Sequence, residues 1–145
     1  MMTPYNNPSK DENYNKQLKD EGPQTDNMIF VFGSNQAGRH GAGAAKYAKE
    51  HYKATYGVGE GITGRSYALP TKDHNIQTRS LKDIEASIVL FLDCASVNED
   101  KIFKVTPIVC GLAGFTKREI SRLFMNHKIP FNVVFSREWF GKGTT

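Results

Sequence analysis

The residues most suggestive of chemistry lie between Gly33 and Lys46, where four glycines, Arg39 and His40 separate an apolar run from a lysine-rich stretch. Glycine loses more conformational freedom on folding than any other residue, so such a cluster predicts a tight turn or a place where a ligand approaches the main chain. Where a glycine loop leads into a helix, unpaired N–H groups and the helix dipole favour an anion. The pattern therefore predicts a phosphate-binding loop or, alternatively, only a tight turn.

The loop does not have the spacing of the common nucleotide-binding motifs. Its centre, GRHGAG at 38–43, contains neither GxxxxGK[ST] nor GxGxxG. Arg39 is the best anion candidate, because one guanidinium can donate two hydrogen bonds to a phosphate. His40 either donates to a ribose hydroxyl or phosphate, or occupies an awkward backbone angle.

No metal site is predicted from the histidines or cysteines. His51, His74 and His127 have no metal-ligand spacing with one another or with a cysteine. Cys94 and Cys110 lie in apolar contexts, so we expect both to be buried free thiols. We therefore expect neither a metal nor another cofactor.

The elements around the loop set its place in a fold. The run MIFVF at 28–32 is short, apolar, and rich in β-branched and aromatic residues, which is typical of a strand buried on both faces. After the loop, Ala45, Ala48, Tyr52 and Thr55 recur at helical spacing. The expected order is strand, glycine loop, helix.

Strand and helix signals then alternate along the chain. Three further strands are predicted at 66–70, 103–111 and 130–135, and two further helices at 81–91 and 116–124. Ser80 is a candidate N-cap, and Thr116 with Glu119 has the spacing of a capping box. Pro107 cannot donate a ladder hydrogen bond, so it should lie near a strand edge, end or bulge.

This alternation predicts an α/β fold with a largely parallel sheet. Ligands of such folds bind in loops at the carboxyl ends of the strands. The three unusual loops of this chain, after Phe32, Leu69 and Val109, fall at predicted strand ends. We therefore expect the functional site there.

Composition favours one soluble domain. A chain of 145 residues suits a single core, and 19 basic against 15 acidic residues give a formal charge of +4, a slight preference for anions. There is no apolar run of about eighteen residues and no basic segment followed by an apolar one at the start. We expect a cytoplasmic protein without a membrane partner.

The expected domain is flanked by polar ends. Residues 1–27 are dominated by Asn, Lys, Asp, Glu, Gln and Pro, which predicts a flexible arm. The folded domain is expected at 28–140, and 141–145 is expected to be a flexible tail.

Three segments together resemble one known family. SNQAGRHGAGAA at 34–45, SYALPTKD at 66–73 and VTPIVCGLAGF at 105–115 resemble the macro domains, closest to the branch that includes the terminal ADP-ribose glycohydrolases. The resemblance covers about 28–135 and extends to small bacteriophage proteins, which would place the chain in a host cytoplasm. It implies a three-layer sandwich whose mixed, largely parallel sheet carries helices on both faces.

The resemblance also implies a ligand, ADP-ribose or an ADP-ribosylated macromolecule. Residues 41–43 would wrap its diphosphate and distal ribose, residues 111–114 would close the other side, and Asn35 would lie near the distal ribose. Phe115 either stacks on a base or packs in the core, and Asp26 is the nearest counterpart of the family's adenine-binding aspartate. The full expected binding set is Ser34, Asn35, Arg39, His40, Gly41, Ala42, Gly43, Ala44, Thr71, Cys110, Gly111, Leu112, Ala113, Gly114 and Phe115.

Lys72 and Asp73 are the catalytic candidates. In the glycohydrolase branch a lysine at the position of Lys72 attacks the anomeric carbon of the distal ribose, and an amine needs to be partly deprotonated for this. The carboxylate that assists in that branch is replaced by Ala113, and Asp73 could substitute only if a turn brings it towards Lys72. Lys72 could instead be a solvated or phosphate-contacting cation.

Three functions remain open. The first is a binding module for ADP-ribose or a related nucleotide, which includes a cyclic nucleotide defence signal. The second is an ADP-ribosyl hydrolase that acts through Lys72. The third is a nucleic-acid-binding protein that uses basic residues such as Lys46, Lys49 and Lys53, although a solvated helix face explains those lysines equally.

Overall fold

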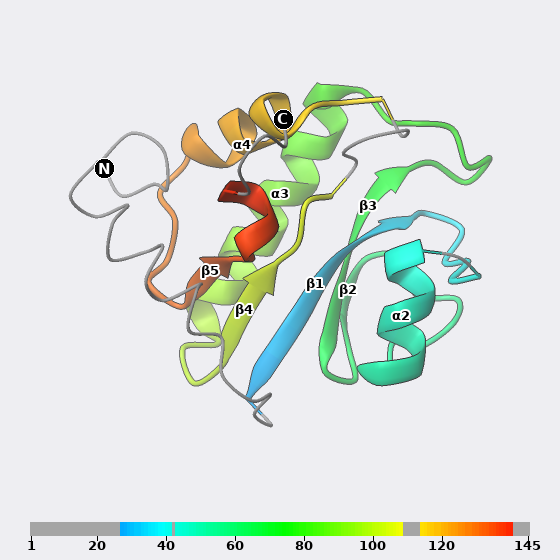
Figure 1. Cartoon of the computed structure of the whole chain (residues 1–145), viewed down its shortest axis with the longest axis horizontal. Coiled ribbons are helices and arrows are strands. Elements are labelled where there is room, and N and C mark those ends of the chain that lie inside the picture. Colours follow the sequence, from blue (N-terminus) through cyan, green and yellow to red (C-terminus); the bar gives the residue numbers. More distant parts are fainter. Residues whose placement is uncertain (1–26, 42, 109–113, 141–145) are drawn as a thin grey trace.

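The computed structural model describes residues 27–41, 43–108 and 114–140, which form an α/β architecture (Figure 1). Along these residues the elements are β1 (Met28–Asn35), α2 (Gly43–His51), β2 (Gly61–Thr63), β3 (Ser66–Lys72), α3 (Leu81–Val97), β4 (Ile102–Val105), α4 (Lys117–Met125), β5 (Val133–Phe135) and the 3₁₀ helix η2 (Arg137–Phe140). The α/β class predicted from the sequence is confirmed.

The strands form one mixed, largely parallel sheet, as predicted. Its order is β2-β3-β1-β4-β5, with β1 at the centre. β1 pairs in parallel with β3 and with β4, and β4 pairs in parallel with β5. β2 runs antiparallel to β3 at the edge. The first predicted strand is therefore the central strand of the sheet.

Side chains of β1 alternate between two cores, because successive residues of a strand point to opposite faces. Ile29 and Val31 belong to the larger core, which α3 and α4 cover. Phe30 and Phe32 belong to a smaller core, in which Ala48 of α2 packs. Figure 1 shows α2 on one side of the sheet and α3 with α4 on the other. Helices thus cover both faces, an arrangement compatible with a three-layer sandwich.

The predicted helix starts are confirmed. The amide of Asp83 donates to the Ser80 hydroxyl at 3.1 Å, which makes Ser80 the N-cap of α3. At α4, the amide of Glu119 donates to the Thr116 hydroxyl and the amide of Thr116 donates to the Glu119 carboxylate at 2.9 Å. Both arms of the capping box are therefore present.

Two boundaries differ from the sequence prediction. The first helix ends at His51 and does not reach Thr55, because Lys53 has a φ of +60°, which no helix residue adopts. β4 ends at Val105, so Pro107 follows the strand end, where a residue without an N–H is tolerated.

Some predictions fall on residues beyond the described ranges: the arm up to 26, the tail at 141–145, and Cys110. Cys94 is a free thiol and is only partly buried. Within the described ranges no helix is long and apolar enough to cross a membrane.

Candidate functional site

The carboxyl end of β1 is a topological switch point. After β1 the chain passes to α2 on the face of the smaller core, whereas after β3 and β4 it passes to α3 and α4 on the face of the larger core (Figure 1). Since β1 lies between β3 and β4, its following loop diverges from both neighbours. At such a point open α/β folds bind ligands outside the strand ends, and we refer to this region beyond the end of β1 as the crevice.

The loop after β1 is held closed by the side chain of Asn35. The amide of Arg39 donates to Asn35 Oδ1 at 2.9 Å, and Asn35 Nδ2 donates to the Arg39 carbonyl at 2.9 Å. The amide of Gly38 donates to the Asn35 carbonyl at 2.9 Å. Asn35 was expected to lie near a ribose, and here its side chain shapes the loop from which a ligand would be bound.

Two glycines are needed because a second loop packs against the first. Gly38 has a φ of +73°, and a Cβ on it would lie 2.3 Å from the carbonyl carbon of Gly57. A Cβ on Gly59 would lie 2.3 Å from the carbonyl oxygen of Asn35. The amide of Gly57 donates to the Gly38 carbonyl at 2.7 Å. Both glycines therefore serve a close backbone approach.

Gly41 has no such structural reason. It is exposed, its φ is not positive, and a Cβ on it would meet nothing within 4 Å. Two residues later α2 begins at Gly43, and no acidic residue lies in the first turn of α2. The exposed guanidinium of Arg39 makes no hydrogen bond or ion pair with the described residues. Open backbone, a helix start and a cation therefore lie together.

His40 is buried without a hydrogen-bond partner. Its side chain is 1% exposed, and neither ring nitrogen is hydrogen-bonded to any described residue. The ring meets Phe32 edge-on at 5.4 Å and Tyr56 at 6.0 Å. Burial lowers the pKa of His40; the Val58 backbone opposes this shift and the charge of Lys49 adds to it. The ring is therefore neutral near pH 7.

The backbone angle of His40 is ordinary. Among the described residues other than glycine, only Lys53 and Ile76 have positive φ. The alternative that histidine is present to tolerate an awkward angle is therefore wrong. A buried neutral imidazole with two unsatisfied nitrogens remains, and each such nitrogen normally costs roughly 1–3 kcal/mol.

Near the carboxyl ends of β1 and β3, two side-chain hydroxyl groups donate hydrogen bonds to backbone carbonyls. The Thr71 hydroxyl donates to the Ser34 carbonyl at 3.2 Å, and the Ser34 hydroxyl donates to the Gly59 carbonyl at 2.5 Å. Both side chains are buried. Ser34 and Thr71 were expected to touch a ligand, and in this structure their hydroxyls bind the protein backbone.

Lys72 lies beside the first loop. Its Cα is the register partner of Asn35, and its carbonyl accepts from the amide of Gln36 at 2.9 Å. The side chain is partly exposed, and its ammonium makes no hydrogen bond or ion pair within the described part of the chain. A cation available to an anionic ligand therefore borders the crevice from the β3 side.

The carboxylate of Asp73 is already engaged in a turn. Asp73 Oδ1 accepts from the amides of Asn75 at 2.8 Å and Gln77 at 3.0 Å. Ile76 in this turn has a φ of +61°, which is strained for a β-branched residue. Asp73 therefore organises the segment that follows Lys72, and one of its oxygens is committed to that task.

Of the loop expected after Val109, the structure describes only the end, from Gly114 onwards. Gly114 is exposed with a φ of +121°, and Phe115 packs against the larger core, which agrees with its reading as a core aromatic. Ala44 is exposed in the first turn of α2. Gly43 is the first residue of α2. The other expected residues, Ala42, Cys110, Gly111, Leu112 and Ala113, lie outside the described residues, as does Asp26.

Sequence reasoning missed the supporting loop at 57–59. The signal was present as the glycine-rich YGVGEG at 56–61, directly after the spacing pattern that predicted a helix up to Thr55. That the glycines of two separate loops pack together depends on tertiary structure. The described residues include no group of three His, Cys, Asp or Glu side chains placed to hold a metal.

The basic surface of α2 is less free than its sequence suggests. Lys46 Nζ lies 3.9 Å from Glu50 Oε2, and Lys49 Nζ lies 5.2 Å from the centre of the Tyr56 ring. Lys53 follows the helix and does not extend its face. The continuous three-lysine face expected for a nucleic-acid-binding helix is therefore absent from α2.

The chain matches no family model, no curated protein and no solved structure in the comparisons.

Proposed function

We infer that the crevice at the carboxyl end of β1 binds ADP-ribose or an ADP-ribosyl group. The observation that carries this proposal is the position of the glycine loop at the switch point between β3, β1 and β4. A ligand there can reach the loops of all three strands at once. In open α/β folds this crevice commonly receives phosphate-bearing ligands.

The local chemistry supports an anion. Gly41 leaves space next to the main chain, and cations are supplied by Arg39 in the loop after β1 and by Lys72 at the end of β3. The start of α2 adds the partial positive charge of its dipole, without an acidic side chain in the first turn to neutralise it. A diphosphate would satisfy these groups together.

The choice of ADP-ribose among phosphate-bearing ligands comes from the resemblance to macro domains. A mixed sheet with helices on both faces is the arrangement that this resemblance implies, so we extend the proposal to a macro-domain-like fold.

The proposed function is ligand binding. Hydrolysis of the bound ADP-ribosyl group would depend on Lys72 as the only catalytic side chain. The expected assisting carboxylate is Ala113 in this chain, and the carboxylate of Asp73 is engaged in the 73–77 turn. A lysine nucleophile without a general acid or base is poorly activated. We therefore propose a binding module whose turnover, if measurable, is slow.

Calorimetric titration of the full chain with ADP-ribose tests the proposal, with ADP and AMP as controls. Micromolar affinity corresponds to roughly 8 kcal/mol and is readily measured. Gly41→Glu puts bulk and negative charge into the open space, and should abolish binding without unfolding the chain. Leu90→Glu, on an exposed part of α3, adds the same charge elsewhere and should leave binding unchanged.

Equal binding of ADP-ribose by the parent and by Gly41→Glu would refute the glycine loop as the ligand site. Failure of the parent to bind ADP-ribose would refute the proposed ligand. In that case AMP binding would direct attention to nucleotide signals in place of ADP-ribose.

A further inference from the structure

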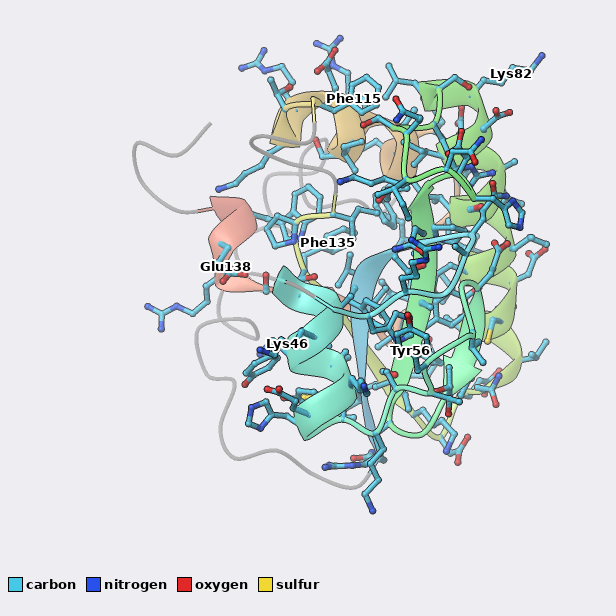
Figure 2. All side chains as sticks on the ribbon, turned by 90° about the vertical axis from the view of Figure 1, so that its right-hand side faces the viewer. Lys46, Tyr56, Lys82, Phe115, Phe135 and Glu138 are labelled. Carbon is cyan, nitrogen blue, oxygen red and sulfur yellow. The ribbon has the colours of Figure 1, made fainter. Side chains whose placement is uncertain are left out.

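A groove lies beside the crevice, on the face of the sheet that α2 only partly covers. It has a volume of about 780 Å³ and runs between α2 and η2 over the surface of β1 and β4. Figure 2 shows Lys46 on α2 and Glu138 on η2, the two elements that flank it. This volume is within the range of about 300–1,000 Å³ that is typical of small-molecule sites.

One wall of the groove is aromatic. The rings of Phe30 and Tyr52 stack at 4.6 Å, and Tyr47 lies over Phe30 at 5.5 Å with an angle of 56° between the rings. All three side chains line the groove. Tyr47 remains 47% exposed, so part of its ring is open to contact from the groove side. An exposed ring backed by other rings is a suitable platform for a flat aromatic group.

The opposite wall is polar. Glu138 lines it with Lys104 and Arg137, and Phe30 is the register partner of Lys104. Glu138 Oε1 accepts from the Ser136 hydroxyl at 2.9 Å, which orients the carboxylate and leaves its other oxygen without a hydrogen bond to the described residues. A carboxylate accepts a hydrogen bond from an amino group.

The groove reaches the start of α2, next to the proposed ligand site. Ala44 lies in the first turn of α2, directly after the glycine loop, and it lines the groove. The groove is also lined by Thr106 and Pro107, which follow β4 and lead towards the loop after Val109. A ligand whose phosphates lie at the start of α2 can therefore extend one end along α2 towards Tyr47.

We propose that this groove is a nucleobase subsite, which takes an amino-bearing base between the Tyr47 ring and the Glu138 carboxylate. The inference rests on the proposed function, because it assigns the base of the same ligand whose phosphates the glycine loop binds. If the ligand is ADP-ribose, this subsite would recognise its adenine through stacking and one amine contact, with no need for an aspartate before β1.

Calorimetric titration of the full chain with three ligands tests the subsite. The ligands are ADP-ribose, its hypoxanthine analogue, in which a carbonyl replaces the amine, and ribose 5-phosphate, which has no base. Tyr47→Ala should weaken ADP-ribose binding roughly tenfold, within the range for stacking of a base on an aromatic side chain. Tyr47→Phe keeps the ring and should bind within about threefold of the parent. Ribose 5-phosphate should bind both variants and the parent equally.

Glu138 is tested through discrimination between the two bases. The parent should prefer ADP-ribose over the hypoxanthine analogue, and Glu138→Ala should lose that preference. Glu99→Ala, at an exposed position after α3, is the matched control and should retain it. Urea unfolding of every variant verifies that the fold is intact.

The outcomes separate the two proposals. Unchanged ADP-ribose affinity in Tyr47→Ala, or no preference between the bases in the parent, overturns the subsite while the glycine-loop site stands. If the parent binds no ADP-ribose, the proposed function fails, and amide chemical shifts decide the subsite: AMP should then shift Tyr47 and Lys104. Absence of those shifts overturns the subsite too.

Discussion

Gly38 and Gly41 lie in one loop, and the structure predicts opposite consequences for replacing each by alanine. Gly38 has a φ of +73° and its missing Cβ would overlap the backbone of Gly57 at 2.3 Å. Gly41 lacks a positive φ and has open space around it. Gly38→Ala should therefore damage the fold, and Gly41→Ala should damage only the binding of a ligand.

The size of the first effect follows from two contributions. A left-handed backbone costs an L-residue roughly 1–2 kcal/mol, and overpacking against a backbone that cannot move aside costs roughly 1–3 kcal/mol. Gly38→Ala should therefore lose about 2–5 kcal/mol of unfolding free energy. With a urea slope of about 2 kcal/mol per M, the unfolding midpoint falls by about 1–2.5 M.

Gly41→Ala should behave in the opposite way in the same assay. A glycine replaced by alanine at an unstrained position stabilises a protein by about 0.4–1 kcal/mol, because the unfolded chain loses freedom. The urea midpoint of unfolding of Gly41→Ala should therefore stay unchanged or rise slightly. In titration with ADP-ribose the same variant should lose at least about tenfold in affinity, because the methyl group occupies the space assigned to the ligand.

Two results from these variants would contradict the predictions. A midpoint lowered as much in Gly41→Ala as in Gly38→Ala would mean that the loop has one structural role throughout. Full stability together with full ADP-ribose affinity in Gly41→Ala would remove the ligand from this part of the loop.

Three further predictions use the same assays. Lys72→Ala should weaken ADP-ribose binding roughly tenfold or more, because the variant lacks one of the two cations proposed to contact the diphosphate; unchanged affinity together with loss of turnover of an ADP-ribosylated substrate would instead make Lys72 a nucleophile. Since burial depresses the pKa of His40 below its ordinary 6.5, unfolding free energy should fall as the pH drops below 6.5, and His40→Phe should flatten this fall and add roughly 1–2 kcal/mol at pH 7. An equally steep decline in the variant would assign the acid sensitivity to other groups. Asn132→Asp should lower the unfolding free energy by roughly 1–3 kcal/mol, because Asn132 Nδ2 donates to the carbonyls of Ala95, Asn98 and Lys101, and a carboxylate cannot; unchanged urea unfolding would contradict this.

Much of the fold could be predicted because its main elements have strong local signals. The apolar run at 28–32 became the central strand, and the caps at Ser80 and Thr116 start the helices that they predict. The strand β2 was missed because it has only three residues and its single large apolar side chain, Ile62, is exposed. Its pairing with β3 supplies what its own sequence lacks.

The site was less predictable, because the roles of its residues depend on partners far along the chain. Nothing near Gly38 in the sequence indicates that Gly57 will pack against it. The sequence placed His40 in the loop, but it did not indicate that the ring is buried between Phe32 and Tyr56. Motif spacing predicted a ligand loop after β1, and the tertiary contacts show which residues of this loop are bound to the rest of the protein and which are exposed.

The central position of β1 has a consequence for the order in which the protein folds. The Thr106 hydroxyl donates to the carbonyl of Val31 across a separation of 75 residues, next to the pairing of β1 with β4. Contacts of such high sequence separation are costly in loop-closure entropy and are typical of slow folding. The proposed ligand site lies beside this pairing, so we expect a nascent chain to bind ADP-ribose only after β4 has emerged and docked. Ligand binding during synthesis would therefore report completion of the sheet.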